Sequence, residues 1–508
     1  MVARVKPAAA GPARTIEVHN PVTGHVIDRV ADSTPQDVAA AVAAARVAQP
    51  AWEAMGVERR LRLLRRWADL VYAERKVGAE VVRAESGKTE SGAQEEILVI
   101  DAAVAYYYYT APGLLRPHTR RSLFPLLQWA RVYYKPYGVV GVISPWNFPF
   151  LLAFLDMIPA LAAGNTVVIK PSEVAPFSAR WGVELMYRAG IPHNVVQIVN
   201  GAGETGAALV DQVDYVMFTG STGVGRKIAA RAGERLVPCS MELGGKDPAI
   251  ILKDADLEQA AKGLLLSALA NAGQVCVSTE RVYVEAAVYD KFLARLRYHI
   301  ERFKVGPGDD LNTHMGSLTN ARELLRIEAQ VADALARGAQ VLYGGRRRPD
   351  LGPLFYEPTI LVNVDHTMLV MQEETFGPLI PIMRVKDADE AVRLANDSEY
   401  GLSGLIYTRD LGRGEKLATR LASGDVAVNR PHWVWGTLAA PMGGGKPASG
   451  VGRRGGPEGL LRFVRAQSVV MDSAEKVLPQ EYVHLTPWLR FLYDLRRRLL
   501  PYLPFLRS

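Results

Sequence analysis

The chain has 508 residues, which allows two or three domains and a large buried core without disulfide staples. Its 49% hydrophobic and 22% charged residues are ordinary for a globular protein. A net charge of +7, with no long Lys/Arg run in the body of the chain, argues against a nucleic-acid-binding protein.

The two cysteines form no disulfide framework, which favours a reducing, cytoplasmic compartment. The sequence has no CxxC pair or His/Cys cluster, so we expect no metal site. No run of about 18 apolar residues predicts a membrane-spanning helix.

The first part of the chain predicts a loose arm, residues 1–14, followed by helices. Thr34 is a suitable N-cap for a helix over 34–49, with Asp37 at its third position. Apolar residues recur at helical spacing from Glu58 to Glu74, and 95–109 is predicted to be a further helix.

From Gly138 onward, strands and helices alternate, which predicts a parallel, doubly wound sheet. Gly244-Gly245 is predicted to be the hinge into a second α/β unit that runs to about Gly452. The expected strands are 139–143, 166–169, 195–199, 215–218, 281–284 and 379–383, and the expected helices in this part are 151–163 and 175–189.

Three short segments carry residues that could do chemistry. Cys276 follows an apolar helix-like run in a Gly-Gln-Val-Cys context, Glu242 begins Glu-Leu-Gly-Gly-Lys, and Asn147 lies in Pro-Trp-Asn-Phe-Pro. Taken singly, each has a structural interpretation: a cysteine that packs as a small apolar residue, a capping acid and a turn residue. Cys239, in a strand-like run, is expected to be a packing residue.

Two glycine-rich turns could receive a phosphate. Residues 201–206 match GxGxxG after a strand, but no clear acidic residue follows at the expected distance, so this turn is the weaker candidate. Residues 218–225 lead from a strand into a helix at Arg226, where free N–H groups could bind a pyrophosphate.

Together these segments, in this order, resemble the aldehyde dehydrogenase superfamily over about residues 15–475. The resemblance implies that Cys276 is the nucleophile, which forms a thiohemiacetal and then a thioester. It implies that Asn147 and the Cys276 N–H stabilise the oxyanion, and that Glu242 activates water for hydrolysis to a free carboxylate.

The resemblance also implies a nicotinamide cofactor. Because a carboxylate would repel a 2′-phosphate, Glu173 favours NAD over NADP. The implied cofactor-binding residues are Trp146, Lys170, Ser172, Glu173, Gly220, Ser221, Gly225, Leu243, Glu374 and Phe376.

The implied fold class is α/β, with two doubly wound parallel-sheet domains and a small β oligomerisation arm, in a homodimer or homotetramer. The expected division is a flexible arm at 1–14, an NAD-binding domain at 15–128 and 145–246, an oligomerisation arm at 129–144 and 464–484, a catalytic domain at 247–463 and a basic amphipathic tail at 485–508.

The identity of the aldehyde stays open. The C-terminal family motif departs from its usual form, with Met442 in place of Phe and one extra residue before Ser449. Ala270 stands where succinate semialdehyde dehydrogenases often carry an Arg, although Arg430 could replace it, so that substrate is the second candidate. Trp433 and Trp435 suggest an apolar or aromatic wall of a substrate tunnel, with packing inside the protein as the alternative interpretation.

The last segment, 487–507, is apolar and basic. Residues 488–508 contain five arginines and one aspartate, and the apolar residues fall on one helical face. Such a segment could lie on the inner face of a membrane, or cover an apolar groove on its own subunit or a partner. A catalytically silent scaffold at a membrane surface is the alternative from another functional class.

Overall fold

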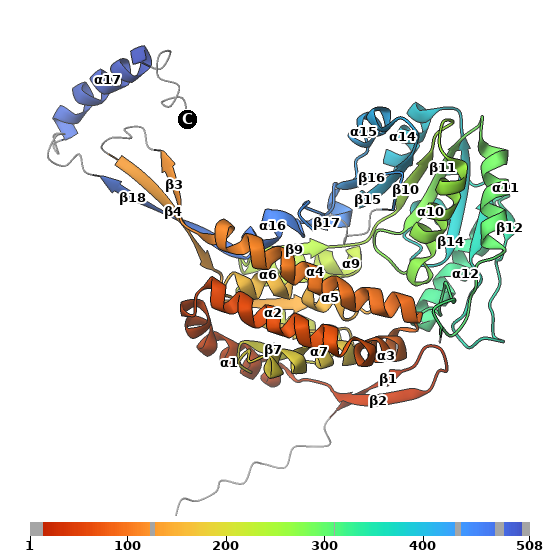
Figure 1. The fold of residues 1–508 in the computed structure, drawn as a ribbon, viewed down its shortest axis with the longest axis horizontal. Helices are drawn as coiled ribbons and strands as arrows, with labels where there is room; N and C mark the ends of the chain where they lie inside the picture. Colours follow the sequence, from red (N-terminus) through yellow and green to blue (C-terminus); the bar gives the residue numbers. More distant parts are fainter. Residues whose placement is uncertain (1–13, 122–127, 309, 432–437, 473–481, 500–508) are drawn as a thin grey trace, which may run out of the picture.

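The computed structural model describes residues 14–121, 128–308, 310–431, 438–472 and 482–499 (Figure 1). Within these residues the fold is α/β, with two large, mostly parallel sheets and a small antiparallel sheet, as the sequence predicts. A hairpin of β1 (Thr15–His19) and β2 (Val26–Ala31) precedes them.

The first large sheet has the strand order β17-β9-β8-β5-β6-β7. All its pairings are parallel except that of β17 with β9. Its strands are β5 (Val139–Ile143), β6 (Thr166–Lys170), β7 (Val196–Ile198), β8 (Tyr215–Thr219), β9 (Cys239–Glu242) and β17 (Gly450–Val451).

Helices cover both faces of this sheet because alternate strand residues point to opposite sides. Val139 and Val168 pack with α1, α8 and α9, whereas Val140 and Val167 pack with the helices of the other face. The helices are α1 (Pro35–Ala54), α2 (Val57–Ala73), α3 (Arg75–Ser86), α4 (Glu90–Leu115), α5 (Leu151–Phe154), α6 (Met157–Ala162), α7 (Phe177–Arg188), α8 (Gly203–Val210) and α9 (Thr222–Glu234).

The second large sheet has the order β12-β13-β14-β11-β10-β15-β16, with only β12 antiparallel to its neighbour. Its strands are β10 (Asp247–Ile251), β11 (Thr279–Glu285), β12 (Gln340–Tyr343), β13 (Thr359–Val362), β14 (Leu379–Val385), β15 (Ser403–Tyr407) and β16 (Asp425–Val428). The helices of this part are α10 (Leu257–Leu269), η1 (Ala270–Gly273), α11 (Tyr289–Ile300), α12 (Ala321–Ala336), α13 (Leu369–Gln372), α14 (Ala388–Asn396) and α15 (Leu411–Ala418). After them, η3 (Pro447–Ser449) leads into β17 of the first sheet, and α16 (Gly456–Leu461) packs against α4 and α6.

A three-stranded antiparallel sheet projects from the body (Figure 1). It consists of β3 (His118–Arg121), β4 (Gln128–Pro136) and β18 (Val464–Asp472). The segment 129–144, expected as one part of an arm, divides between two sheets, because β5 pairs with β6 and β8 instead of continuing β4. The chain turns between them at Gly138, whose φ is +132°.

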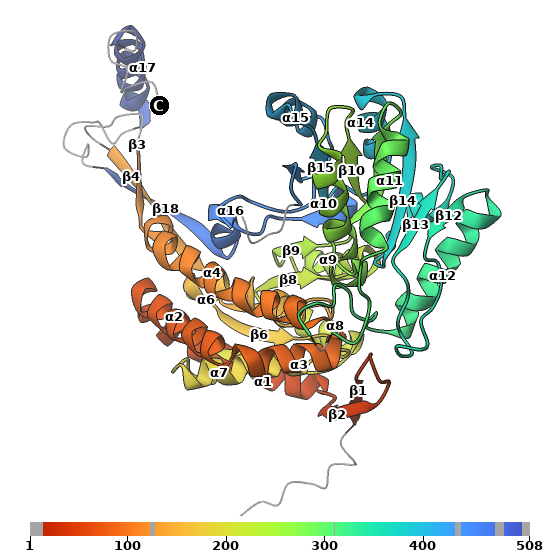
Figure 2. The same ribbon diagram turned by 45° about the vertical axis from the view of Figure 1, so that its right-hand side comes forward.

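The last helix, α17 (Tyr482–Leu499), lies beyond the three-stranded sheet and apart from the body in both views (Figures 1 and 2). Trp488, Phe491 and Leu495 are partly exposed on it, at 39%, 58% and 41%. Of the helices in the described part of the chain, none is long and apolar enough to span a bilayer.

Local sequence signals explain where several helices begin and end. Thr34 and Asp37 form the expected capping box at the start of α1, with Thr34 Oγ1 accepting from Asp37 N at 3.2 Å. The helix expected over 151–163 is interrupted between α5 and α6, because Pro159 has no N–H to donate to Leu155 O.

Tight packing inside the first unit generates a stability prediction. A Cβ at Gly182 of α7 would come within 2.3 Å of Phe154 and 2.8 Å of Phe150. Gly182→Ala should therefore destabilise the protein by about 1–3 kcal/mol through overpacking, measured by thermal or urea denaturation. Gly113→Ala on α4, where a Cβ meets no atom within 4 Å, is the control and should not destabilise. Equal stability of the two variants would contradict the prediction.

Candidate active site

A cavity of about 920 Å³ opens where the chain passes from β9 to β10. Residues at or just after the carboxyl ends of β5, β6, β8 and β9 line it, which is where open α/β sheets bind ligands. The second unit contributes the Cys276 turn, part of α12 and the turn after α13. Predicted site residues that line it are Trp146, Asn147, Lys170, Ser172, Glu173, Gly220, Ser221, Glu242, Leu243, Cys276, Glu374 and Phe376.

Cys276 follows a strained backbone turn at the end of α10. Asn271, Ala272 and Gly273 all have positive φ, of 50°, 55° and 73°. Such strain at non-glycine residues persists only where the surroundings hold it, and Asn271 Nδ2 does so by donating to Asn147 O at 2.9 Å. The Cys276 side chain is half-buried, and burial raises the pKa of its thiol to about 12.

Asn147 is brought to the same turn. Its Nδ2 donates to Gln274 O at 2.9 Å, two residues before Cys276. An amide nitrogen carries two hydrogens, so a second one is available for a ligand. The segment is anchored by the buried carboxylate of Glu96, which accepts from Phe150 N at 2.8 Å and forms an ion pair with Lys88 at 2.7 Å.

Glu242 ends β9, paired on one side with Thr219 and on the other with Gly450. The residue is 4% exposed, and its Oε1 has no hydrogen-bond partner among the described residues. Burial raises the pKa of Glu242 to about 7, so the carboxylate can gain or lose a proton near neutral pH. A buried, unsatisfied carboxylate beside a cavity is typical of a functional group.

The buried carboxylate of Glu280 holds the segment that carries Glu374 and Phe376 in place. Glu280 accepts from Thr375 N and from Phe376 N, each at 2.7 Å, and from Lys246 Nζ at 2.8 Å. Phe376, with a φ of +53°, packs edge-on against Trp146 with ring centroids 5.5 Å apart. Burial raises the pKa of Glu374, whose Oε1 accepts from Gly245 N at 3.2 Å.

Lys170 and Glu173 meet at the other end of the cavity. Lys170 Nζ lies 3.5 Å from Glu173 Oε2 and donates to Gly201 O at 2.6 Å. Burial lowers the pKa of the Lys170 ammonium, whereas the Glu173 side chain is 41% exposed. The GxGxxG turn, the weaker candidate from sequence, also reaches the cavity through Gly203 and Gly206.

The turn before α9 has the geometry of an anion site. Ser221 precedes the helix without using its side chain as a cap, so it leaves the first N–H groups of α9 uncapped beside the cavity that Gly220 and Ser221 line. Gly225 does not line the cavity; a Cβ there would come within 2.4 Å of Leu243, so glycine lets the helix approach β9. A cavity of this size and lining fits a dinucleotide.

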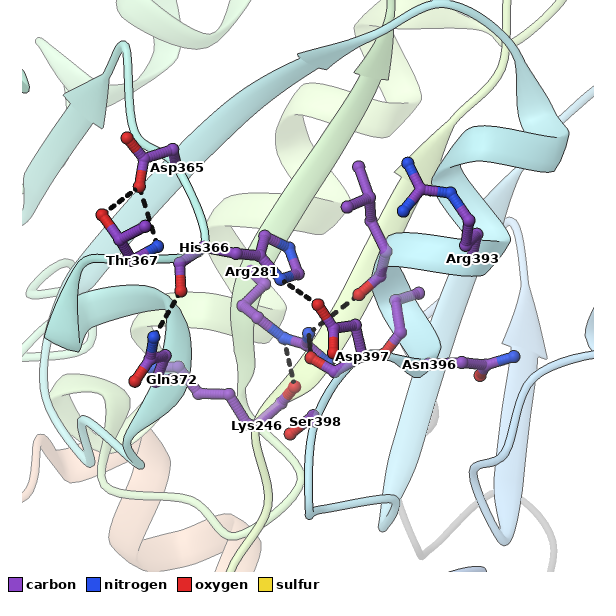
Figure 3. A network of polar contacts seen from close by, with 12 residues as sticks. Lys246, Arg281, Asp365, His366, Thr367, Gln372, Arg393, Asn396, Asp397 and Ser398 are labelled. Carbon is purple, nitrogen blue, oxygen red and sulfur yellow. Dashed lines mark hydrogen bonds and ion pairs between the residues drawn. The ribbon is translucent and has the colours of Figure 1, made fainter.

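The sequence alone did not point to several buried residues that hold the site in place. Figure 3 shows Arg281 at the centre of a buried network, where Nε donates to Lys246 O at 2.8 Å and Nη2 to Ala395 O at 2.8 Å. The one signal in the sequence for Arg281 was its position five residues after Cys276. Asp156 and Arg454, buried near Glu242, are 298 residues apart and carried no local signal.

Of the residues that the sequence links to substrate specificity, the structure describes only some. Arg430 is exposed after β16, and the adjacent Pro431 lines a small cavity together with Val277, the residue after Cys276. Trp433 and Trp435 lie outside the described residues. Cys239 lies on β9 and packs with the apolar residues of that sheet.

Comparisons with known proteins agree with this geometry. The model of the "Aldehyde dehydrogenase family" matches residues 8–469. A protein of Mycobacterium ulcerans (strain Agy99) named putative succinate-semialdehyde dehydrogenase (NADP+) 2 is 43% identical, over 98% of this chain and 96% of its own. Glutarate-semialdehyde dehydrogenase of Pseudomonas aeruginosa is 38% identical, over 89% and 93% of the two chains.

A solved structure gives the same result. The succinate-semialdehyde dehydrogenase of Burkholderia pseudomallei superposes with a TM-score of 0.86 at 37% identity, covering 90% of this chain and 95% of that one. With a matching fold, a family model over most of its length and full-length relatives, the chain belongs to the aldehyde dehydrogenase family, whose members are NAD(P)-dependent enzymes that oxidise aldehydes.

Proposed function

We propose that this enzyme uses Cys276 as its nucleophile and NAD as its cofactor, and that it oxidises short aldehydes bearing a terminal carboxylate, with succinate semialdehyde as the first candidate. The observation that carries the chemistry is that Cys276, Asn147 and Glu242 line one cavity. The relatives named for succinate and glutarate semialdehydes support the substrate class.

In this proposal the two large units have different roles. Residues 15–128 and 145–246 hold the cofactor, and 247–463 carry the nucleophile. The N-terminus of α9, Lys170, Ser172 and Glu173 bind the dinucleotide, while Trp146, Leu243, Glu374 and Phe376 surround its nicotinamide end. When bound, the nicotinamide supplies the hydride acceptor.

The first step joins Cys276 to the aldehyde. Because burial raises the pKa of the Cys276 thiol to about 12, the thiol needs a base, and the Glu242 carboxylate in the same cavity accepts its proton. The sulfur then bonds to the carbonyl carbon. Asn147 Nδ2 and the Cys276 N–H donate to the oxygen as it gains negative charge.

The second step frees the product. After loss of hydride, the acyl group is a thioester on Cys276, and Glu242 releases the thiol proton to solvent through the open cavity and becomes a carboxylate again. Glu242 takes a proton from water, the water oxygen bonds to the acyl carbon, the C–S bond breaks and the thiolate leaves with the bonding electrons. The product is a carboxylic acid.

Substitution of Cys276 and Glu242 tests this chemistry. Turnover of wild-type enzyme should fall about tenfold per pH unit below the Glu242 pKa of about 7, because only the carboxylate is a base. Glu242→Gln should lower kcat by roughly 10²–10⁴-fold and Cys276→Ser should abolish turnover, both followed by absorbance of the reduced cofactor. Cys239→Ser is the control. Turnover that survives Cys276→Ser would sink the proposal.

The substrate class is tested with matched aldehydes. Succinate semialdehyde should give a higher kcat/KM than butanal, which has the same chain length but no carboxylate. If Arg430 holds that carboxylate, Arg430→Ala should raise KM for succinate semialdehyde roughly tenfold or more and leave butanal unchanged. The exposed Arg409→Ala is the control. A preference for butanal, or for long or aromatic aldehydes, would favour an apolar tunnel.

Cofactor preference depends on Glu173. A carboxylate beside the ribose repels a 2′-phosphate, so we expect wild-type enzyme to favour NAD, although the Mycobacterium ulcerans relative is named for NADP. Glu173→Gln should lower the ratio of kcat/KM with NAD to kcat/KM with NADP about tenfold. Glu204→Gln, at an exposed residue of α8, should leave this ratio unchanged. A wild-type preference for NADP would contradict this assignment.

We also propose that α17 lies on an anionic membrane surface and that the three-stranded sheet joins two copies of the chain. Trp488, Phe491 and Leu495 lie on one face of α17, with Arg490 and Arg497 on the opposite face. Aromatic and basic residues in this arrangement suit the headgroup region of a bilayer.

Vesicle sedimentation tests the role of α17. The full chain should bind vesicles rich in phosphatidylserine, and deletion of 487–508 should remove binding without changing turnover of a short aldehyde. Arg490→Glu/Arg497→Glu should also abolish binding. Binding unaffected by the deletion would contradict the proposal. A drop in mass by light scattering after the deletion would instead place α17 on the partner subunit.

A further inference from the structure

A buried ion cluster joins three parts of the chain behind the site. Arg454 donates to Asp156 through two bonds, Nε to Oδ1 at 3.0 Å and Nη2 to Oδ2 at 2.6 Å. Arg462 forms an ion pair with the same carboxylate. Asp156 and Arg454 are almost wholly buried, and the cluster carries one more positive than negative charge.

The cluster lies beside the base. Arg454 Nη2 also donates to Thr219 Oγ1 at 2.9 Å, and Thr219 on β8 is in register with Glu242 on β9. Side chains in register on neighbouring parallel strands point to the same face, so the guanidinium and the Glu242 carboxylate share that face. On the other side of β9, β17 pairs with Glu242 and leads directly into Arg454.

Acidic groups and one arginine act most strongly on the Cys276 thiol. Asp247, Glu242 and Glu374 all raise the pKa of Cys276, and Arg454 lowers it. For Glu242, Arg454 lowers the pKa together with Arg462 and Arg453, and Asp156 raises it. Arg454 is thus the cation that acts on both groups.

The excess positive charge of this buried cluster destabilises the fold unless a further negative charge compensates it. A buried guanidinium without full compensation is destabilising, yet two arginines here share one carboxylate. Arg462 Nε and Nη1 have no hydrogen-bond partner among the described residues. Part of the positive charge is therefore left to act on neighbouring groups such as Glu242, and Arg454 is held toward that group by its bond to Thr219.

We propose that Arg454 is a positioning residue for the Cys276–Glu242 couple: Asp156 fixes its guanidinium, which stabilises the negative charge as that charge passes between the carboxylate and the sulfur. The inference rests on the proposed function, in which Cys276 is the nucleophile. It adds a charged group that acts on the reacting atoms without touching the substrate.

Alkylation of Cys276 by iodoacetamide tests this without cofactor or substrate. In a Cys239→Ser background, the rate at each pH below the thiol pKa follows the thiolate fraction. Arg454→Gln should slow alkylation roughly three- to tenfold across that range, after the higher nucleophilicity of a more basic thiolate is allowed for. Arg454→Lys should restore part of the rate because it keeps the charge.

Arg462→Gln is the matched control, because it removes an arginine from the same cluster and leaves the Asp156–Arg454 pair. It should change the alkylation rate by less than about twofold. If Arg454→Gln unfolds, the double variant Asp156→Asn/Arg454→Gln, which leaves no unpaired carboxylate, replaces it. Thermal melting and binding of the reduced cofactor check that each variant is folded.

The outcomes separate this inference from the proposed function. A folded Arg454→Gln variant that alkylates at the parent rate, or an Arg462→Gln variant slowed as much, would overturn the role of Arg454. Turnover that survives Cys276→Ser would overturn the nucleophile itself. An alkylation rate lowered in Arg454→Gln and partly restored in Arg454→Lys supports the inference.

Discussion

The site depends on the short connection between β9 and β10. Only four residues, 243–246, lead from the end of β9 in one large sheet to the start of β10 in the other, so the carboxyl end of β9 must lie close to the amino end of β10. The glycines make this approach possible: a Cβ at Gly244 would come within 2.5 Å of the Glu374 carboxylate, and one at Gly245 within 2.6 Å of Cys276 O. The link thus brings together Glu242, Cys276 and Glu374, for which we propose the roles of base, nucleophile and cofactor-binding acid.

Buried carboxylates hold the surrounding loops in place. Glu96 binds the segment that carries Asn147, Glu280 binds the segment that carries Phe376, and each is neutralised by a buried lysine. Glu242 has no such partner, and its pKa rises accordingly. The difference between paired and unpaired acids separates the groups that hold loops in place from the group that we propose moves a proton.

Elements whose signals lie within a few residues of one another could be predicted from the sequence. The capping box of Thr34 and Asp37, the strands before the glycine-rich turns and the short motifs around Cys276 all depend on neighbours within a few residues. The missed features depend on distant partners. Asp156 looked like part of a continuous helix, and only the fold brings it to Arg454. The hairpin β1–β2 was missed as well, because its strands are mostly exposed and lack a strong apolar alternation.

The return of the chain at β17 has a consequence for synthesis of the protein. Glu242 stays on an open sheet edge until Gly450 and Val451 have left the ribosome and paired with β9. Long-range pairing of this kind closes slowly, and an open edge is prone to wrong pairing in the meantime. A nascent chain that stops before residue 450 therefore contains Cys276 and Glu242 but lacks the strand that pairs with β9. Enzymatic activity in cells should accordingly appear only after synthesis has passed Val451.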